Sequence, residues 1–202
     1  NQKQIINFTS YNGIANFEAK NNGEFQPSFA LTCAIVAKLY QNRSNPDADK
    51  VLKMYLSKGP NLFGYHTQNT LIDYETEKII HYPSETDFGE TTAINSARIK
   101  RELTFSKSTL QDSLLQDALI DTASARYVQQ LTGLSDPTIL VAIGTYFGRP
   151  AKLWFPWYGQ DGARFTAKRG AWFGCLDGGL YLYSDNYLYN DSASRGVVCE
   201  RK

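Results

Sequence analysis

The chain has 202 residues, of which 42% are hydrophobic, so it is long enough to bury a core in one domain or a small pair of domains. Its 21 basic and 20 acidic residues give a formal net charge of +1, which argues against a nucleic-acid binder that works by neutralising phosphates. Aromatic residues make up 13%, a composition too rich in rings for a disordered chain and typical of recognition surfaces.

No segment of the sequence predicts a membrane span. The longest uninterrupted apolar stretch is Ile139 to Ile143, far shorter than the roughly 20 residues that a spanning helix needs. The chain begins at Asn1 rather than at Met and shows no basic-then-apolar leader, so we expect a mature protein or an excised fragment. We therefore expect no insertion into a membrane.

The N-terminal segment predicts a β-hairpin. Ile5–Phe8 and Ile14–Phe17 are short apolar runs on either side of Asn12-Gly13. Asn-Gly accepts the positive φ of a type I′ turn, so we expect the two runs to pair with each other.

Two helices are predicted next. Ser28 is a suitable N-cap for a helix that ends near Tyr40, because apolar residues recur between them at helical spacing. The second helix begins at Pro46, which suits the first helical position, and Asp47 lies where a carboxylate favours the helix dipole. It ends before Gly59-Pro60.

The middle of the chain is predicted to be mainly β-structure. Leu71–Tyr74 and Ile79–Tyr82 form a hairpin in this prediction, joined by the polar residues between them. Ala97–Phe105 alternates apolar and polar residues, as an edge strand does.

A long helix and a buried strand are predicted after the edge strand. Thr109 and Asp112 resemble a capping box at the start of a helix over Thr109–Leu131, and Gly133 lies just past its end. Thr138–Ile143 is a β-branched apolar run, which we interpret as a buried central strand.

The C-terminal segment is rich in aromatic residues and glycine, and all three tryptophans lie between positions 154 and 172. Leu180–Tyr183 and Tyr187–Tyr189 predict a hairpin around the turn Ser184–Asn186, with leucines on one side and tyrosines on the other. Gly196–Glu200 is a predicted closing strand.

Three cysteines are too few for a disulfide scaffold and lack the spacing of a zinc site. Cys33 lies in an apolar helical context, where a free thiol behaves as a small hydrophobe. We favour a disulfide between Cys175 and Cys199, with Cys33 and Cys199 as the alternative pair. Either bridge would place the protein outside the cytosol.

The sequence offers little for catalysis. It holds only two histidines, His66 and His81, and none of the common nucleophile, zinc or nucleotide-binding motifs. His81 is flanked by apolar residues and is expected to be a structural residue of a sheet. Glu85, Asp87 and Glu90 form a loose acidic cluster that would permit carboxylate-dependent chemistry, although a solvated loop is the preferred explanation.

Calcium is the one cofactor that the residue types allow. Asp177, Asp185, Asn186 and Asp191 carry oxygen donors of the kind that calcium prefers. Their spacing fits no EF-hand loop, and turn formation also explains them. The prediction is therefore a protein without a metal or another cofactor, with calcium as the alternative.

Four segments of the C-terminal half, in their order, resemble C-type-lectin-like domains. More narrowly, they resemble the bacterial and phage branch of that family, which includes invasin- and intimin-type adhesin tips and diversified surface receptors. The segments are Leu153–Gly159, Arg169–Gly174, Leu180–Leu182 and Ser194–Glu200.

The resemblance implies an α+β fold with a small antiparallel sheet and irregular loops. It covers about the last fifty residues, or the last hundred if the helix over Thr109–Leu131 and the strand over Thr138–Ile143 belong to it. The expected organisation is an N-terminal mixed portion over 1–105, with hairpins and helices, and a C-type-lectin-like portion over 106–202. The two portions could belong to one domain. The chain lacks the Glu-Pro-Asn type signature of calcium-dependent lectins.

The resemblance also implies a binding surface of aromatic loops, since rings bury a large area at low entropic cost. Trp154 and Trp172 are expected in the core, whereas the tyrosines are expected to point outward. The expected ligand-binding residues are Trp157, Tyr158, Arg164, Asp177, Tyr181, Tyr183, Asp185, Asn186, Tyr187 and Tyr189.

These observations predict a secreted or cell-surface recognition domain, without enzymatic activity, that binds a glycan or a host or cell-surface protein. Such an adhesin would contribute to cell adhesion and virulence. One alternative is a glycan-acting hydrolase that uses carboxylates such as Glu85 and Asp87. Another is a structural assembly subunit of a surface appendage.

Overall fold

The fold is taken from a computed structural model. It describes residues 6–8, 24–25, 27–56, 65–82, 100–106, 110, 112–154, 168–176, 179–186, 194–196 and 199–200. For residues 6–8, 24–25, 55, 65–69, 175–176, 179, 183, 185–186, 194–196 and 199–200 only the backbone is described.

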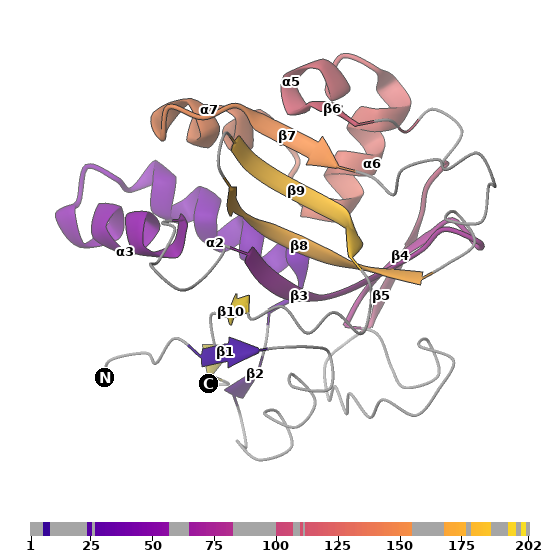
Figure 1. The fold of residues 1–202 in the computed structure, drawn as a ribbon, viewed down its shortest axis with the longest axis horizontal. Coiled ribbons are helices and arrows are strands. Elements are labelled where there is room, and N and C mark those ends of the chain that lie inside the picture. The colour runs from indigo at the N-terminus through magenta and orange to yellow at the C-terminus, as the bar shows by residue number, and fades with distance from the viewer. Residues whose placement is uncertain are drawn as a thin grey trace.

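The described residues form an α+β fold of five helices and a seven-stranded sheet, with two further pairs of short strands (Figure 1). The helices are α2 (Phe29–Gln41), α3 (Pro46–Leu56), α5 (Leu115–Ala118), α6 (Thr122–Thr132) and α7 (Thr138–Tyr146). The strands are β1 (Ile6–Phe8), β2 (Glu24–Phe25), β3 (Tyr65–Asp73), β4 (Lys78–His81), β5 (Arg101–Thr104), β6 (Ser113–Leu114), β7 (Ala151–Trp154), β8 (Lys168–Leu176), β9 (Gly179–Asn186), β10 (Ser194–Gly196) and β11 (Cys199–Glu200).

The seven-stranded sheet has the order β5-β4-β3-β8-β9-β7-β6. All neighbours are antiparallel except β7 and β9, which are parallel. Strands β3 to β5 come from the predicted N-terminal portion over 1–105 and β6 to β9 from the portion over 106–202. The two portions therefore share one sheet.

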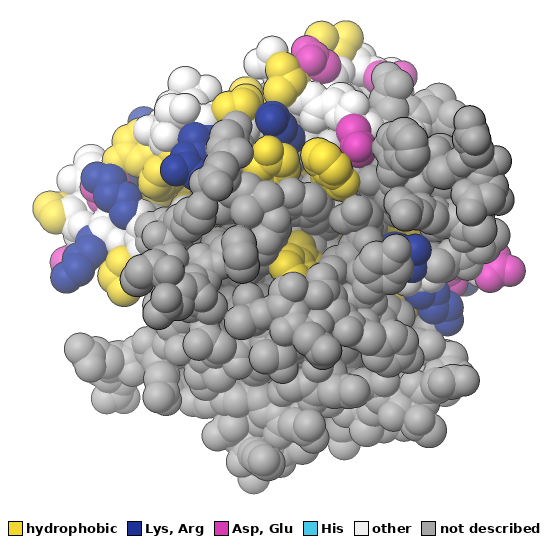
Figure 2. Space-filling model, viewed as in Figure 1, with side chains coloured by type: hydrophobic (Ala, Val, Ile, Leu, Met, Phe, Trp, Pro, Cys, Tyr) yellow, Lys and Arg dark blue, Asp and Glu magenta, His cyan; other side chains and the backbone are white. Residues whose placement is uncertain are grey.

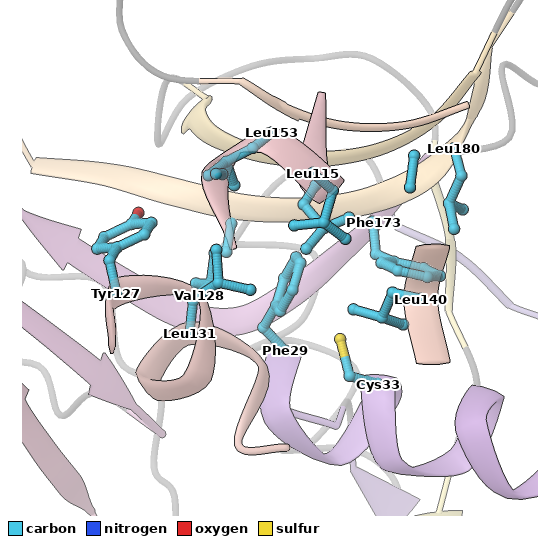
Figure 3. Close-up of a cluster of buried hydrophobic side chains, with 14 of the residues drawn as sticks. Phe29, Cys33, Leu115, Tyr127, Val128, Leu131, Leu140, Leu153, Phe173 and Leu180 are labelled. Carbon is cyan, nitrogen blue, oxygen red and sulfur yellow. The ribbon is translucent and has the colours of Figure 1, made fainter. Parts of the chain in front are cut away.

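The helices α2, α6 and α7 cover one face of this sheet, which we call the helix face (Figure 1). Phe29 of α2 and Phe173 of β8 meet edge to face there, with ring centroids 5.8 Å apart. Figure 3 shows these two rings between the α2 helix and the sheet, with the Cys33 sulfur beside them. Cys33 is a free, fully buried thiol, as its apolar context predicts, and burial raises the pKa of this thiol well above its ordinary value. The alternative bridge between Cys33 and Cys199 is therefore not formed.

Three sequence predictions of local structure are confirmed. Helix α2 begins after Ser28, whose side chain accepts a hydrogen bond from the backbone N–H of Leu31 at 3.2 Å. Helix α3 begins at Pro46, as expected. The hairpin of β3 and β4 pairs Leu71 with Ile80 and has its turn where the polar residues lie. Ala97–Ile99 lie outside the described residues, and the rest of the predicted edge strand contains β5.

The predicted N-terminal hairpin is not tested, because its turn and Ile14–Phe17 lie outside the described residues. Among the described residues, β1 pairs with β10, with Asn7 opposite Arg195, and β2 pairs with β11 in the same antiparallel way. The predicted closing strand over Gly196–Glu200 is likewise divided between these two small sheets. Local turn signals do not predict such pairings, because they join residues about 174 to 190 positions apart.

The single helix predicted over Thr109–Leu131 is wrong. Leu119 and Ile120 interrupt it, and Asp121 starts α6 as a new N-cap, because its carboxylate accepts the N–H of Ser124 at 2.7 Å. The hydrogen bond from Ser124 also holds the pKa of Asp121 below its ordinary value. Gly133 ends α6 in the left-handed conformation at φ 65°, as predicted.

The predicted strand over Thr138–Ile143 is also wrong, because these residues lie in α7. A short apolar run cannot be assigned to helix or strand from its pattern alone. Here the carboxylate of Asp136 accepts the backbone N–H of Thr138 at 3.1 Å, just before the helix. Leu140 and Ile143, three residues apart, then enter the core together.

Gly144 of α7 gives a prediction in which packing outweighs helix propensity. A Cβ at this position would lie 2.6 Å from the carbonyl oxygen of Arg149 and 2.9 Å from the amide nitrogen of Ala151. Gly144→Ala should therefore lower the free energy of unfolding by about 1 to 3 kcal/mol, although alanine favours a helix by about 1 kcal/mol. Urea denaturation would measure this.

The control is Thr145→Ala, at the next and exposed position of the same helix. It should change the free energy of unfolding by no more than about 0.5 kcal/mol. If Gly144→Ala were as stable as the wild type or more stable, the backbone around Arg149 would be able to move and make room for the added methyl group.

The C-terminal hairpin predicted around Ser184–Asn186 is wrong as well. These residues continue β9, which pairs with β8 through the connection between Leu176 and Gly179. Ser184 is fully buried, so its polarity did not mark a surface turn. Its hydroxyl instead donates to the carbonyl oxygen of Trp154 at 2.8 Å.

In the part of the chain that is described, no helix has both the length and the apolar character to cross a bilayer.

Candidate functional site

The face of the sheet opposite the helix face carries a group of aromatic residues on β7, β8 and β9. Side chains alternate between the two faces of a strand, and Phe173 and Leu182 belong to the core on the helix face. Their neighbours Trp172 and Tyr181 therefore lie on the second face. In register, Trp154 of β7 lies opposite Tyr183 of β9.

Trp154, Tyr181 and Lys152 form a cluster on this face, which we call the Trp154 cluster. The centroids of the Trp154 and Tyr181 rings are 6.4 Å apart with an interplanar angle of 58°. The ammonium nitrogen of Lys152 lies 5.3 Å from the centroid of the Tyr181 ring and 3.4 Å from its hydroxyl oxygen. A cation in this position is attracted by the ring, so Lys152 and Tyr181 hold each other in place.

The backbone beneath Trp154 is fixed by two hydrogen bonds. Ser184 donates to the carbonyl oxygen of Trp154, and the hydroxyl of Tyr74 donates to the carbonyl oxygen of Ser184 at 2.8 Å. Tyr74 and Ser184 are both fully buried. The exposed indole is thus presented by a strand that is bonded to the core, which is the support that a binding residue requires.

The burial of Tyr181 and Trp154 reverses the sequence expectation. Trp154, expected in the core, is 39% exposed, whereas Tyr181, expected to point outward, is 7% exposed. Leu71 and Ile80 on the same face are buried too, so this face is not the solvated side of a two-layer fold. Alternation in a sequence predicts which side chains share a face but not which face meets water. Trp172 is buried, as expected.

The other predicted ligand-binding residues are not placed by the structure. The backbones of Tyr183, Asp185 and Asn186 belong to β9, but their side chains are outside the described residues. The following predicted site residues lie wholly outside them: Trp157, Tyr158, Arg164, Asp177, Tyr187 and Tyr189.

The same limit applies to the predicted disulfide, the acidic cluster and the calcium ligands. Cys175 and Cys199 are described by their backbones alone. Positions 85, 87, 90, 177 and 191 are outside the described residues. Within the described ranges, no three residues of the types His, Cys, Asp and Glu gather as metal ligands would.

His81 has the structural role that its sequence context predicts. Its Nδ1 lies 2.9 Å from the hydroxyl oxygen of Thr70, and its Nε2 lies 3.1 Å from the carbonyl oxygen of Gln130. The Thr70 hydroxyl also accepts the N–H of Phe29 at 2.9 Å. These bonds connect β3, β4, α2 and α6. Burial, with the nearby charge of Arg101, lowers the pKa of His81 to about 4, so it is neutral at physiological pH.

A second exposed aromatic group, which the sequence analysis missed, lies where α2, α3 and α7 meet. We call it the helical corner and define it by Tyr40, Arg43, Asp49, Lys53 and Tyr146. The Arg43 guanidinium stacks 4.0 Å from the Tyr40 ring centroid, and Tyr146 donates to the Asp49 carboxylate at 2.6 Å. Figure 2 shows basic and hydrophobic side chains mixed at the end of the molecule where α3 lies.

Asp49 and Lys53 of the helical corner compensate each other's charge. The Lys53 ammonium lies 2.5 Å from the Asp49 carboxylate, and its hydrogen bond, with that of Tyr146, holds the pKa of Asp49 below its ordinary value. The same carboxylate raises the pKa of Tyr146. The spacing of Tyr40 and Arg43, three residues apart at the end of a helix, is the one sequence signal for this group. The contacts of the helical corner hold α2, α3 and α7 together, so we assign it a structural role.

In comparisons with known proteins, no protein-family model, no curated protein and no solved structure matches this chain.

Proposed function

We propose that this chain is a non-catalytic recognition domain that binds a glycan through the Trp154 cluster, with a cell-surface protein as the alternative ligand. The observation that carries the proposal is the exposure of Trp154, 39%, on a strand whose backbone is bonded to buried groups. Large rings are normally buried, so an exposed indole held by a rigid frame favours a contact with a ligand.

The chemistry of the cluster suits a sugar. The C–H face of a pyranose is apolar and packs against flat rings, while its hydroxyl groups take hydrogen bonds at the rim. Trp154 supplies the ring and Lys152 supplies N–H donors beside it. Tyr181 is a supporting ring, because it is buried beneath this pair.

We also propose a more specific assignment for the C-terminal part of the fold. The order of the segments from Leu153 to Glu200 supports a divergent C-type-lectin-like region of the adhesin type, restricted to about the last fifty residues. The resemblance does not extend over the last hundred residues, since that would require Thr138–Ile143 to be a strand, and these residues lie in a helix. A secreted or cell-surface location follows if Cys175 and Cys199 form a disulfide. A count of free thiols under denaturing conditions tests this, with one free thiol expected.

The experiment for the function compares the wild-type chain with Trp154→Ala on a glycan array, followed by titration of the best glycan. Removing the ring should weaken binding at least tenfold, because hot-spot tryptophans contribute about 2 kcal/mol or more. Trp154→Phe keeps a flat ring and should retain most of the affinity.

The matched control is Ile120→Ala, which removes another exposed apolar side chain, 84% exposed, in the segment between α5 and α6. It should leave glycan binding unchanged. Equal binding by the wild type and Trp154→Ala would remove the basis of the proposal. Cleavage of an array glycan, lost on substitution of Glu85 or Asp87, would favour the hydrolase alternative instead.

A further inference from the structure

A groove runs between the edge strand β5 and the helix α6, separate from the Trp154 cluster. It consists of two adjacent pockets with volumes of about 470 Å³ and 540 Å³. Arg126 and Gln130 of α6 line both pockets. On the strand side, Thr104 and Phe105 line the first pocket, and Arg101 and Leu103 line the second. We call it the β5–α6 groove.

The outer edge of β5 carries backbone groups that can pair with another strand. In the seven-stranded sheet β5 lies at one end, with β4 as its neighbour. Phe105 donates its N–H to the carbonyl oxygen of Glu77 at 2.9 Å. Hydrogen-bonded and non-bonded pairs alternate along an antiparallel ladder, so Leu103 and Arg101 also bond to β4. The N–H and C=O groups of Glu102 and Thr104 therefore point away from the sheet.

The groove is basic. Arg101 and Arg126 both line it, and none of the described residues that line either pocket is acidic. The nearest carboxylate along the strand, Glu102, is on the other side of β5. It is already bonded to Lys78 at 2.6 Å and to Lys100 at 3.5 Å, so it does not neutralise Arg101.

A buried acceptor lies between the two pockets. The amide oxygen Oε1 of Gln130 is buried and has no hydrogen-bond partner among the described residues. Leaving such an atom without a donor costs about 1 to 3 kcal/mol.

We propose that the β5–α6 groove binds an extended, acidic segment of a partner protein, which adds to the sheet beside β5 and places carboxylates against Arg101 and Arg126. Main-chain hydrogen bonds to Glu102 and Thr104 supply affinity, and the two guanidinium groups select for acidic side chains. Arg101 and residues 103–106 line the groove, so a guest that pairs along this stretch of chain contributes roughly six residues at about 3.3 Å each.

The test selects binders from a display library of random octapeptides with the wild-type chain and measures the enriched peptides by fluorescence anisotropy. We expect enrichment of Asp and Glu. Arg101→Gln and Arg126→Gln should each weaken binding at least tenfold, the loss of one charge-assisted hydrogen bond. Lys38→Gln, which removes an exposed positive charge from α2, should change it less than twofold.

Backbone methylation separates strand addition from simple charge attraction. N-methylation of every second residue of the best peptide should abolish binding in one register and leave it intact in the other, because only alternate N–H groups face β5. Trp154→Ala should bind the peptide like the wild type, so failure of the glycan proposal and failure of this one can be told apart.

Three results of the peptide experiments would overturn the proposal. They are the absence of any enriched peptide, equal weakening by Arg126→Gln and Lys38→Gln, and indifference to N-methylation in both registers. Concentration-dependent dimers that Arg126→Gln dissociates would also overturn it, because the occupant would then be a second copy of the chain.

Discussion

Phe173→Ala is expected to lower the free energy of unfolding by about 3 to 5 kcal/mol, the largest loss for a single substitution that we predict. Phe173 is fully buried in the layer between the sheet and α2. Its ring meets Phe29 edge to face at 5.8 Å, so the substitution removes both buried area and a ring pair (Figure 3). Urea denaturation followed by tryptophan fluorescence would measure the loss.

The control is the same Phe-to-Ala substitution at a position on the edge of the core. Phe147 follows α7 and is only partly buried, so Phe147→Ala should cost clearly less. Phe173→Leu, which keeps most of the volume, should recover much of the stability lost in Phe173→Ala. Similar losses at 147 and 173 would mean that the layer beneath α2 is not the main core.

Stability is expected to fall by about 2 kcal/mol between pH 7 and pH 5 because of His81. In the folded chain its pKa is about 4, since the ring is buried, against 6.5 as the ordinary value. Between these two values the unfolded chain binds a proton that the folded chain excludes. Lowering the pH through this window therefore favours unfolding, and the effect ends below about pH 4. Urea denaturation at both pH values measures it.

The matched control is the other histidine of the chain. His66→Gln should keep the decrease between pH 7 and pH 5, whereas His81→Gln should remove most of it, even if the variant is less stable overall. A wild-type chain with equal stability at pH 7 and pH 5 would show that the bonds to Thr70 and Gln130 persist with a charged ring.

Local signals in the sequence predicted those elements whose ends are fixed by nearby atoms. Ser28 caps α2 through the amide of Leu31, only three residues away. Gly133 ends α6 because a left-handed conformation is required at that position. The β3–β4 hairpin is likewise closed by its own turn, with Asp73 accepting the N–H groups of Glu75 and Thr76.

Two of the errors lie where a long-range contact decided between two local possibilities. Thr138–Ile143 has the composition of a strand, yet it packs as a helix over β7. Ser184 has the polarity of a turn residue, yet it is buried and bonded to the backbone of Trp154. In each case the deciding partner is distant in sequence or belongs to another layer of the fold.

The sequence by itself determined the α+β class, the N-cap of α2, the C-cap of α6, the first hairpin of the sheet and the burial of Cys33 and His81. Only the tertiary structure decided that Trp154 is exposed while Tyr181 is covered, and that β5 and α6 enclose a basic groove. The reason is that helix caps, turns and alternation are set by neighbouring residues in the chain. Exposure and charge at a site depend instead on which distant segments pack beside it.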